Sequence, residues 1–167
     1  MRSDGLEIER KYLLERVPSP DVLRTLEAVP TRIEQVYLAR TADSPVGGSR
    51  IRRLDGPDGT RYRYTEKRHL HGIVREEREQ EIDAAAFERL LVEADPVRRP
   101  IRKTRHVFDH GGSHLELDVF EGRLAGLAIL EVELDHEEDR PSIPDELGPY
   151  RDVSEDPAYL NWNLARR

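Results

Sequence analysis

Several segments of the chain carry glutamates two positions apart. The two considered first are Glu7 and Glu9 in the stretch LEIERKYLL, and Glu131 and Glu133 in the stretch LEVEL; Glu77 and Glu79 in REEREQEI have the same spacing. Residues two apart on a β-strand share one face and lie about 7 Å from each other. Paired carboxylates supply hard oxygen ligands, which suit Mg²⁺, Mn²⁺ or Ca²⁺. The spacing therefore indicates that these two pairs could hold a divalent cation.

Basic side chains repeat with the same period in three other segments. Arg50 and Arg52 flank an isoleucine, Lys67 ends the run RYRYTEK, and Lys103 and Arg105 alternate in RPIRKTR. Guanidinium and ammonium groups bind phosphate oxygens, and arginine does so with two parallel hydrogen bonds. Cations gathered in one place repel one another until a polyanion arrives. The predicted ligand is a compact, highly charged anion such as a triphosphate, bridged to the carboxylates by a metal ion.

Strands must position these side chains, because alternation is the dominant pattern of the sequence. Eight segments show this alternation: 6–14, 33–40, 49–54, 60–69, 72–82, 99–109, 113–122 and 127–136. Helices are predicted over 19–29 and 83–94, and a short Ser-capped helix is predicted in the tail. The sequential order favours antiparallel pairing, and eight strands are about what a small closed barrel needs. We expect an α+β fold, in which an eight-stranded antiparallel closed β-barrel forms a tunnel.

Alternation alone leaves open which face of the barrel carries the charges. In an ordinary small barrel the apolar faces point inward and the charges meet water. Two features favour the opposite orientation. Carboxylates gather on some strands and cations on others, and the amphipathic helices need an apolar sheet surface to cover. We therefore expect a polar interior, with the helices packed outside the barrel.

Composition narrows the classes of function. The chain has 167 residues, of which 37% are charged and 37% hydrophobic, and a formal charge of −7. This charge disfavours a nucleic-acid or anionic-membrane surface as partner. With no cysteine, a disulfide scaffold, a thiolate metal site and a cysteine nucleophile are excluded. The sequence shows no signal peptide and no apolar run of membrane-spanning length, so we expect one cytoplasmic domain over residues 1–167.

The sequence resembles the CYTH family, also called the triphosphate tunnel metalloenzymes. The first match is EIERK at residues 7–11, which has the family's E-x-E-x-K signature. Further blocks follow in the family's order: QVYL, RIRR, TEKR, REEREQEI, RKTRHVF, ELDVFEG, LEVEL and DVSEDPAYLN. The signature alone is weak in so charged a chain, whereas the ordered series of blocks is specific and covers nearly the whole sequence.

The resemblance implies a closed tunnel of eight strands that hydrolyses a triphosphate with a divalent metal. We expect inorganic tripolyphosphate as substrate, pyrophosphate and orthophosphate as products, and Mg²⁺ or Mn²⁺ as cofactor. The low aromatic content of 6% also favours an inorganic chain over a nucleotide. The alternatives are a thiamine or nucleoside triphosphatase, an adenylate cyclase and a non-catalytic polyphosphate-binding module. The expected partner is a small polyanion, and the protein is expected to be a monomer or homodimer.

The resemblance also assigns roles to individual residues. The expected phosphate ligands are Lys11, Arg50, Arg52, Lys67, Lys103 and Arg105, while Arg75 either binds phosphate or pairs with a carboxylate. The expected metal ligands are Glu7, Glu9, Glu131 and Glu133, and the supporting carboxylates are Glu77, Glu79 and Asp118. Glu7, Glu9, Lys11 and Tyr37 are the expected catalytic residues, with Tyr37 at a mouth of the tunnel.

Overall fold

The computed structural model describes residues 5–40 and 48–166. Residues 1–4, 41–47 and 167, which the predicted single domain also includes, lie outside the described residues. The strands and helices follow one another along the chain without a long linker between them.

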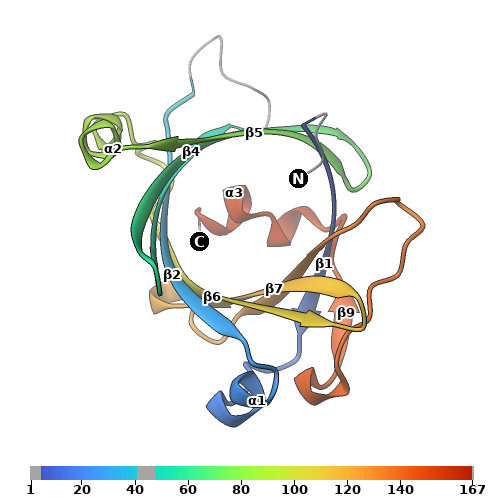
Figure 1. The fold of residues 1–167 in the computed structure, drawn as a ribbon. Helices are drawn as coiled ribbons and strands as arrows, with labels where there is room; N and C mark the ends of the chain where they lie inside the picture. Colours follow the sequence, from blue (N-terminus) through green and yellow to red (C-terminus); the bar gives the residue numbers. More distant parts are fainter. Residues whose placement is uncertain (1–4, 41–47, 167) are drawn as a thin grey trace.

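Eight antiparallel strands close into a barrel, as predicted (Figure 1). Their bounds are β1 Leu6–Leu14, β2 Val29–Tyr37, β3 Ser49–Gly56, β4 Gly59–His71, β5 Val74–Ile82, β6 Ile101–His110, β7 Ser113–Phe120 and β8 Ala128–Glu133. Around the barrel the order is β5-β4-β3-β2-β6-β7-β8-β1, and pairing of β1 with β5 completes the ring. Closure satisfies the backbone groups that open sheet edges would leave unpaired.

A ninth strand, which the alternation did not predict, shares one edge of β1. Strand β5 pairs with the start of β1, and the three-residue β9, Tyr150–Asp152, pairs with its end. Between these two strands the Lys11 backbone N–H donates to Ser154 Oγ over 2.9 Å. The predicted cap residue of the tail helix therefore holds the backbone of β1 instead.

Two helices cover the outside of the barrel. Helix α1, Pro20–Thr25, is capped by the Ser19 side chain, which accepts a hydrogen bond from the Val22 N–H. Helix α2, Ala84–Leu91, is capped by Asp83. Strand β2 starts at residue 29, earlier than predicted, because α1 ends at Thr25 and Glu27 then turns the chain with a φ of 52°.

The apolar faces of the strands point outward, toward these helices. Phe87 of α2 packs against Val36, Ile51 and the ring of Tyr62, whose centroid lies 5.0 Å away. A second cluster lies under α1 and the segment that follows β8. Its buried members include Ile8, Tyr12, Leu115, Leu117, Leu130, Val132, Leu134 and Leu147. The charged faces of the same strands consequently point into the barrel.

Helices α1 and α2 pack outside the barrel, as predicted, whereas the end of the chain takes a different place. The tail forms two short helices, η3 Pro157–Tyr159 and α3 Asn161–Leu164, and α3 lies across the bore (Figure 1). Two other 3₁₀ helices, η1 Gly122–Leu124 and η2 Asp145–Leu147, lie in connections. Inward-facing residues of five strands pack on the tail: Leu13, Tyr37, Ile101, Phe120 and Ile129. Together with Trp162, Leu164 and Ala165, these five residues form the tunnel floor.

The cap of α2 yields a stability prediction. The Asp83 side chain accepts a hydrogen bond from the Ala86 N–H over 2.6 Å. Asp83→Ala removes this bond and should lower the free energy of unfolding by about 1 kcal/mol. Urea denaturation measures the change, and Asp83→Asn, which can still cap, serves as the control. Equal losses in the two variants would contradict a capping role.

Candidate functional site

The interior of the barrel holds a cavity of about 410 Å³ with charged walls. Every predicted site residue except Asp118 lines it: Glu7, Glu9, Lys11, Tyr37, Arg50, Arg52, Lys67, Arg75, Glu77, Glu79, Lys103, Arg105, Glu131 and Glu133. Asp118 lies fully buried behind the wall. The structure thus brings the predicted residues together, while their individual roles stay predictions.

The order of strands around the barrel sorts the charges into two walls. Strands β7, β8, β1 and β5 are neighbours and form the acidic wall, with Glu116, Asp118, Glu131, Glu133, Glu7, Glu9, Glu77 and Glu79. Strands β4, β3, β2 and β6 are neighbours on the other side and form the basic wall, with Arg63, Lys67, Arg50, Arg52, Lys103 and Arg105. The cavity therefore has one side suited to cations and another suited to phosphate oxygens.

Lys11 sits within the acidic wall. Its ammonium lies 2.8 Å from Glu9 Oε1 and also donates a hydrogen bond to Glu131 Oε1. Burial opposes the charge of this ammonium, but the carboxylates of Glu131 and Glu9 outweigh burial and raise the pKa of Lys11. The same contacts help to lower the pKa of Glu9 and Glu131, against the effect of their own burial. These three groups are therefore charged.

Lys67 reaches across from the basic wall to Glu7 and Glu77. Its ammonium forms an ion pair with Glu7 Oε2 and lies 3.1 Å from Glu77 Oε2. Burial raises the pKa of Glu7 to about 7, and the neighbouring Glu9 adds to this rise. For Glu77 burial acts in the same direction, but Lys67, Arg50 and Arg52 outweigh it and lower its pKa to about 2. The two carboxyls differ in protonation near neutral pH.

Arg105 connects the basic wall to the acidic wall. Its guanidinium donates to both carboxylate oxygens of Asp118, over 2.7 and 2.8 Å, and to Glu131 Oε2 over 2.5 Å. A further bond goes to Glu116. Asp118 also accepts a bond from the Lys103 ammonium, whose side chain is 2% exposed. Asp118 therefore holds two predicted phosphate ligands in place from behind.

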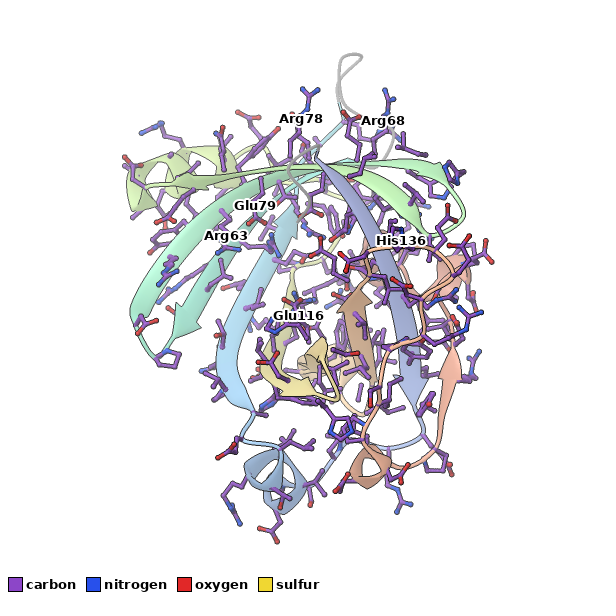
Figure 2. All side chains as sticks on the ribbon, turned by 45° about the vertical axis from the view of Figure 1, so that its right-hand side comes forward. Arg63, Arg68, Arg78, Glu79, Glu116 and His136 are labelled. Carbon is purple, nitrogen blue, oxygen red and sulfur yellow. The ribbon has the colours of Figure 1, made fainter. Side chains whose placement is uncertain are left out.

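Glu79 gathers a second network. Its carboxylate accepts bonds from Arg52 and from the hydroxyl of Thr65, and it lies 2.8 Å from Arg63 Nη1. Figure 2 shows Arg63 and Glu79 on the inner side of their strands, whereas Arg68 and Arg78 project from the outer surface. Burial, together with the neighbouring Arg50, lowers the pKa of Arg52 to about 10. Glu79 thus orients two guanidinium groups toward the cavity.

Arg75 lines the cavity, and its two predicted roles stay predictions. Its guanidinium donates to the backbone carbonyls of Gly72, over 2.8 Å, and Val74, over 3.1 Å.

The position of Tyr37 is a correction, because this residue is buried at the tunnel floor against Trp162 and does not lie at a mouth of the tunnel. A tyrosine ring at the end of β2 faces the apolar cluster that closes the bore, which explains its place.

Sequence reasoning missed several residues that line the cavity. They are Gln35, Gly48, Arg63, Thr65, His69, His114, Glu116, Leu160, Asn161 and Trp162. Arg63, Thr65 and Glu116 follow the same alternation as their predicted neighbours, and Gln35 is in phase with Tyr37. The tail residues gave no periodic signal, because a four-residue helix has too few positions to show one.

The carboxylate oxygens are suitable ligands for a divalent ion. In this structure, however, those of Glu9 and Glu131 are paired with the ammonium group of Lys11. Glu9 lies directly opposite Glu133, and Lys11 lies opposite Glu131, in the pairing of β1 with β8. Within residues 5–40 and 48–166 no three acidic or histidine side chains already converge on one point. The Lys11 ammonium stands between Glu9 and Glu131 instead. A metal ion could use these oxygens once Lys11 turns to a phosphate.

Titration of Glu7 predicts a pH dependence of stability in metal-free protein. Its folded pKa of about 7 exceeds the ordinary value of 4.5, so between these values only the folded chain keeps the proton. Stability from this group is therefore complete below about pH 4.5 and is lost as the pH rises through 7. In EDTA, urea unfolding should show this fall in the wild type and a flatter profile in Glu7→Gln. Parallel profiles would contradict the assignment.

No helix in the part of the chain that the structure describes is long and apolar enough to cross a membrane.

Comparison with known proteins places the chain among characterised relatives. A family model described as the CYTH domain matches residues 5–163. An inorganic triphosphatase of Nitrosomonas europaea is 38% identical over 162 residues, which span 95% of this chain and 96% of that protein. One of Acetivibrio thermocellus is 33% identical over 162 residues, spanning 97% and 94%.

A solved structure agrees with the sequence matches. The crystal structure of an inorganic triphosphatase superposes with a TM-score of 0.59 at 30% identity, and the match covers 96% of this chain and 95% of that one. The residues matched by the family model, 5–163, include every strand that lines the cavity.

Proposed function

Because the chain belongs to the CYTH family, we propose that it hydrolyses inorganic tripolyphosphate to pyrophosphate and orthophosphate with a divalent metal. The observation that carries this proposal is the pair of opposed walls inside one cavity. A triphosphate needs many cations along one side, and a metal ion needs carboxylates on the other. The substrate and its metal fit between the walls.

The basic wall binds and orients the substrate. Arg50, Arg52, Lys67, Lys103 and Arg105 neutralise phosphate oxygens along the tunnel, with Lys11 joining them from the opposite wall. Phosphoryl transfer depends mainly on such positioning and charge neutralisation. Because burial and neighbouring charges fix these cations, little reorganisation is needed when charge shifts toward the leaving group.

The acidic wall holds the metal and orients the water. Glu9, Glu131 and Glu133 would hold a Mg²⁺ or Mn²⁺ ion, which acts as a Lewis acid on the phosphate oxygens. Glu7 accepts a hydrogen bond from the attacking water and aligns it with the terminal phosphorus. In the metal-free protein burial raises the pKa of this carboxyl to about 7, so it can both gain and lose a proton near neutral pH.

Ligand binding must exchange partners within the cavity. In the arrangement described, Lys67, Lys103 and Arg105 of the basic wall are paired with carboxylates, so their mutual repulsion is already relieved without a ligand. Phosphate oxygens would take the place of the carboxylates around the cations, and the carboxylates of the acidic wall would then be free to hold a metal ion. With substrate and metal both bound, the buried charges of both walls would again be compensated.

Product analysis tests the function. We expect purified protein with Mg²⁺ or Mn²⁺ to release orthophosphate and pyrophosphate from tripolyphosphate, and EDTA to abolish the release. The same assay with ATP and thiamine triphosphate measures selectivity. Cyclic AMP with pyrophosphate from ATP would indicate a cyclase instead, and binding of tripolyphosphate without turnover would indicate a non-catalytic module.

Location and assembly are further parts of the proposal. The absence of cysteine from the sequence is compatible with a cytoplasmic enzyme. The cavity is built from a single chain, so a monomer suffices for the reaction, whether or not two chains associate.

A further inference from the structure

The tunnel floor lines the same cavity as the charged walls. Leu160, Asn161 and Trp162 of the tail face this cavity beside Gln35 and Tyr37 of β2. The Trp162 ring meets the Tyr37 ring edge-on, with centroids 5.0 Å apart. The floor is therefore a surface that an inserted ligand can touch.

The tail is fixed firmly enough to act as a stop. The Arg98 guanidinium lies 3.2 Å from the centroid of the Trp162 ring, and its Nε donates to the Trp162 carbonyl over 3.2 Å. Asp95 holds Arg98 through a buried bond of 2.6 Å. The Arg99 N–H donates to the Ala165 carbonyl over 2.8 Å. Burial and these bonds keep the floor in place when a polyanion presses on it.

Three side chains at the floor each bury a polar atom with no hydrogen-bond partner among the described residues. These atoms are Gln35 Oε1, Arg50 Nε and Asn161 Oδ1, and all three side chains line the cavity. Gln35 is 1% exposed, and its Nε2 donates to the Tyr37 hydroxyl over 3.0 Å. A buried polar atom without a partner costs about 1–3 kcal/mol, so such a group usually meets a ligand or water.

The unpaired atoms can serve a phosphate. Arg50 Nε is a donor already. Either amide can rotate by 180° about its last torsion and turn its N–H groups toward the cavity. After that rotation Gln35 accepts the hydrogen bond of the Tyr37 hydroxyl and still satisfies it. Gln35, Arg50 and Asn161, which all line the cavity, then each have a donor available for phosphate oxygens.

The floor stands at a fixed distance from the acidic wall. On β1 the inward positions run from Leu13 at the floor through Lys11 to Glu9, with about 7 Å for each step along the strand. A phosphate held at the floor thus directs the rest of the polyphosphate toward Lys11 and, beyond it, toward Glu9. The position of the floor decides which phosphoanhydride bond faces the proposed metal ligands.

We propose that Gln35 and Asn161, with Arg50, bind the inserted terminal phosphate and set the bond that is cleaved. This inference rests on the proposed function. Each cleavage consumes one water, which adds to the attacked phosphorus while the bridging oxygen leaves with the other fragment. Gln35 and Asn161 are positioning residues, because the reacting bond lies farther up the tunnel.

Trp162 provides a test that is independent of hydrolysis, since it is the chain's single tryptophan. In EDTA, tripolyphosphate should shift the Trp162 emission and protect it from acrylamide quenching. Asn161→Ala should weaken the apparent affinity about 10-fold, as expected for the loss of a hydrogen bond to a charged group. Calorimetric binding of tripolyphosphate that leaves emission and quenching unchanged would overturn the inference and leave the proposed function intact.

The products formed from tetrapolyphosphate show which phosphoanhydride bond is cleaved, and so test whether the floor sets that bond. Its outer bond yields orthophosphate and tripolyphosphate, whereas its central bond yields two pyrophosphates. With metal, the wild type should give one of these pairs at early times, and Asn161→Ala should give both. Asn163→Ala is the matched control, because Asn163 donates to the Pro157 carbonyl and does not line the cavity. An equal loss of both routes in Asn161→Ala, with the product ratio unchanged, would overturn the inference.

Discussion

Replacing Asp118 with asparagine is expected to lower the free energy of unfolding by about 3–5 kcal/mol, the usual cost of breaking a buried ion pair from one side. Asp118 is fully buried and accepts bonds from both Lys103 and Arg105. Burial already lowers the pKa of Lys103, and Asp118 is the strongest influence in the other direction. Without this carboxylate, Lys103 is left buried beside the like charge of Arg105.

Urea denaturation measures the change, and two further variants define its origin. Asp109→Asn is the matched control, because its carboxylate is exposed and pairs with the exposed His114, so a change within about 0.5 kcal/mol is expected. Adding Lys103→Met to Asp118→Asn removes the orphaned ammonium and should restore part of the stability. An Asp118→Asn protein as stable as the Asp109→Asn control would contradict this account.

The architecture was predictable because charge and hydrophobicity alternate so regularly. In β8, for example, Glu131 and Glu133 alternate with Leu130 and Val132, and one face must then be apolar. The amphipathic helices indicate that the apolar face points outward, because Phe87 of α2 needs an apolar sheet surface beneath it. Both inferences depend on local periodicity, which the sequence contains in full.

The two walls of the tunnel were only half predictable. The sequence places carboxylates on the first, fifth, seventh and eighth strands, which are not all consecutive along the chain. They become neighbours only because β1 pairs with both β5 and β8 when the barrel closes. Long-range pairing of this kind leaves no trace in the local pattern.

The floor was not predictable from periodicity. Ile101 shares a strand face with Lys103 and Arg105, and in the sequence it blurs the alternation of β6. In the structure this same isoleucine marks the level at which the charged bore ends and the apolar floor begins. The irregular position was therefore informative, but its meaning depends on where the tail packs.

Replacing Glu133 with glutamine is expected to reduce metal-dependent hydrolysis of tripolyphosphate by more than about 100-fold. Loss of groups that merely support a metal ligand costs 10–100-fold, and loss of a ligand should cost more. Glu133 lies opposite Glu9 at the exposed end of β8 and lines the cavity. Because its side chain is exposed, the substitution should change stability by no more than about 0.5 kcal/mol.

Separate readouts distinguish a metal ligand from a phosphate ligand. Tripolyphosphate binding in EDTA, followed by Trp162 emission or calorimetry, should survive in Glu133→Gln because the basic wall is intact. Phosphate release should fall and should recover partly at high Mg²⁺ or Mn²⁺, whereas Glu138→Gln, outside the cavity, should behave as the wild type. Full activity in Glu133→Gln would refute its place in the metal site. If Glu133→Gln instead fails to bind tripolyphosphate in EDTA, Glu133 contributes to binding of the substrate itself. No metal is present under these conditions to account for the loss.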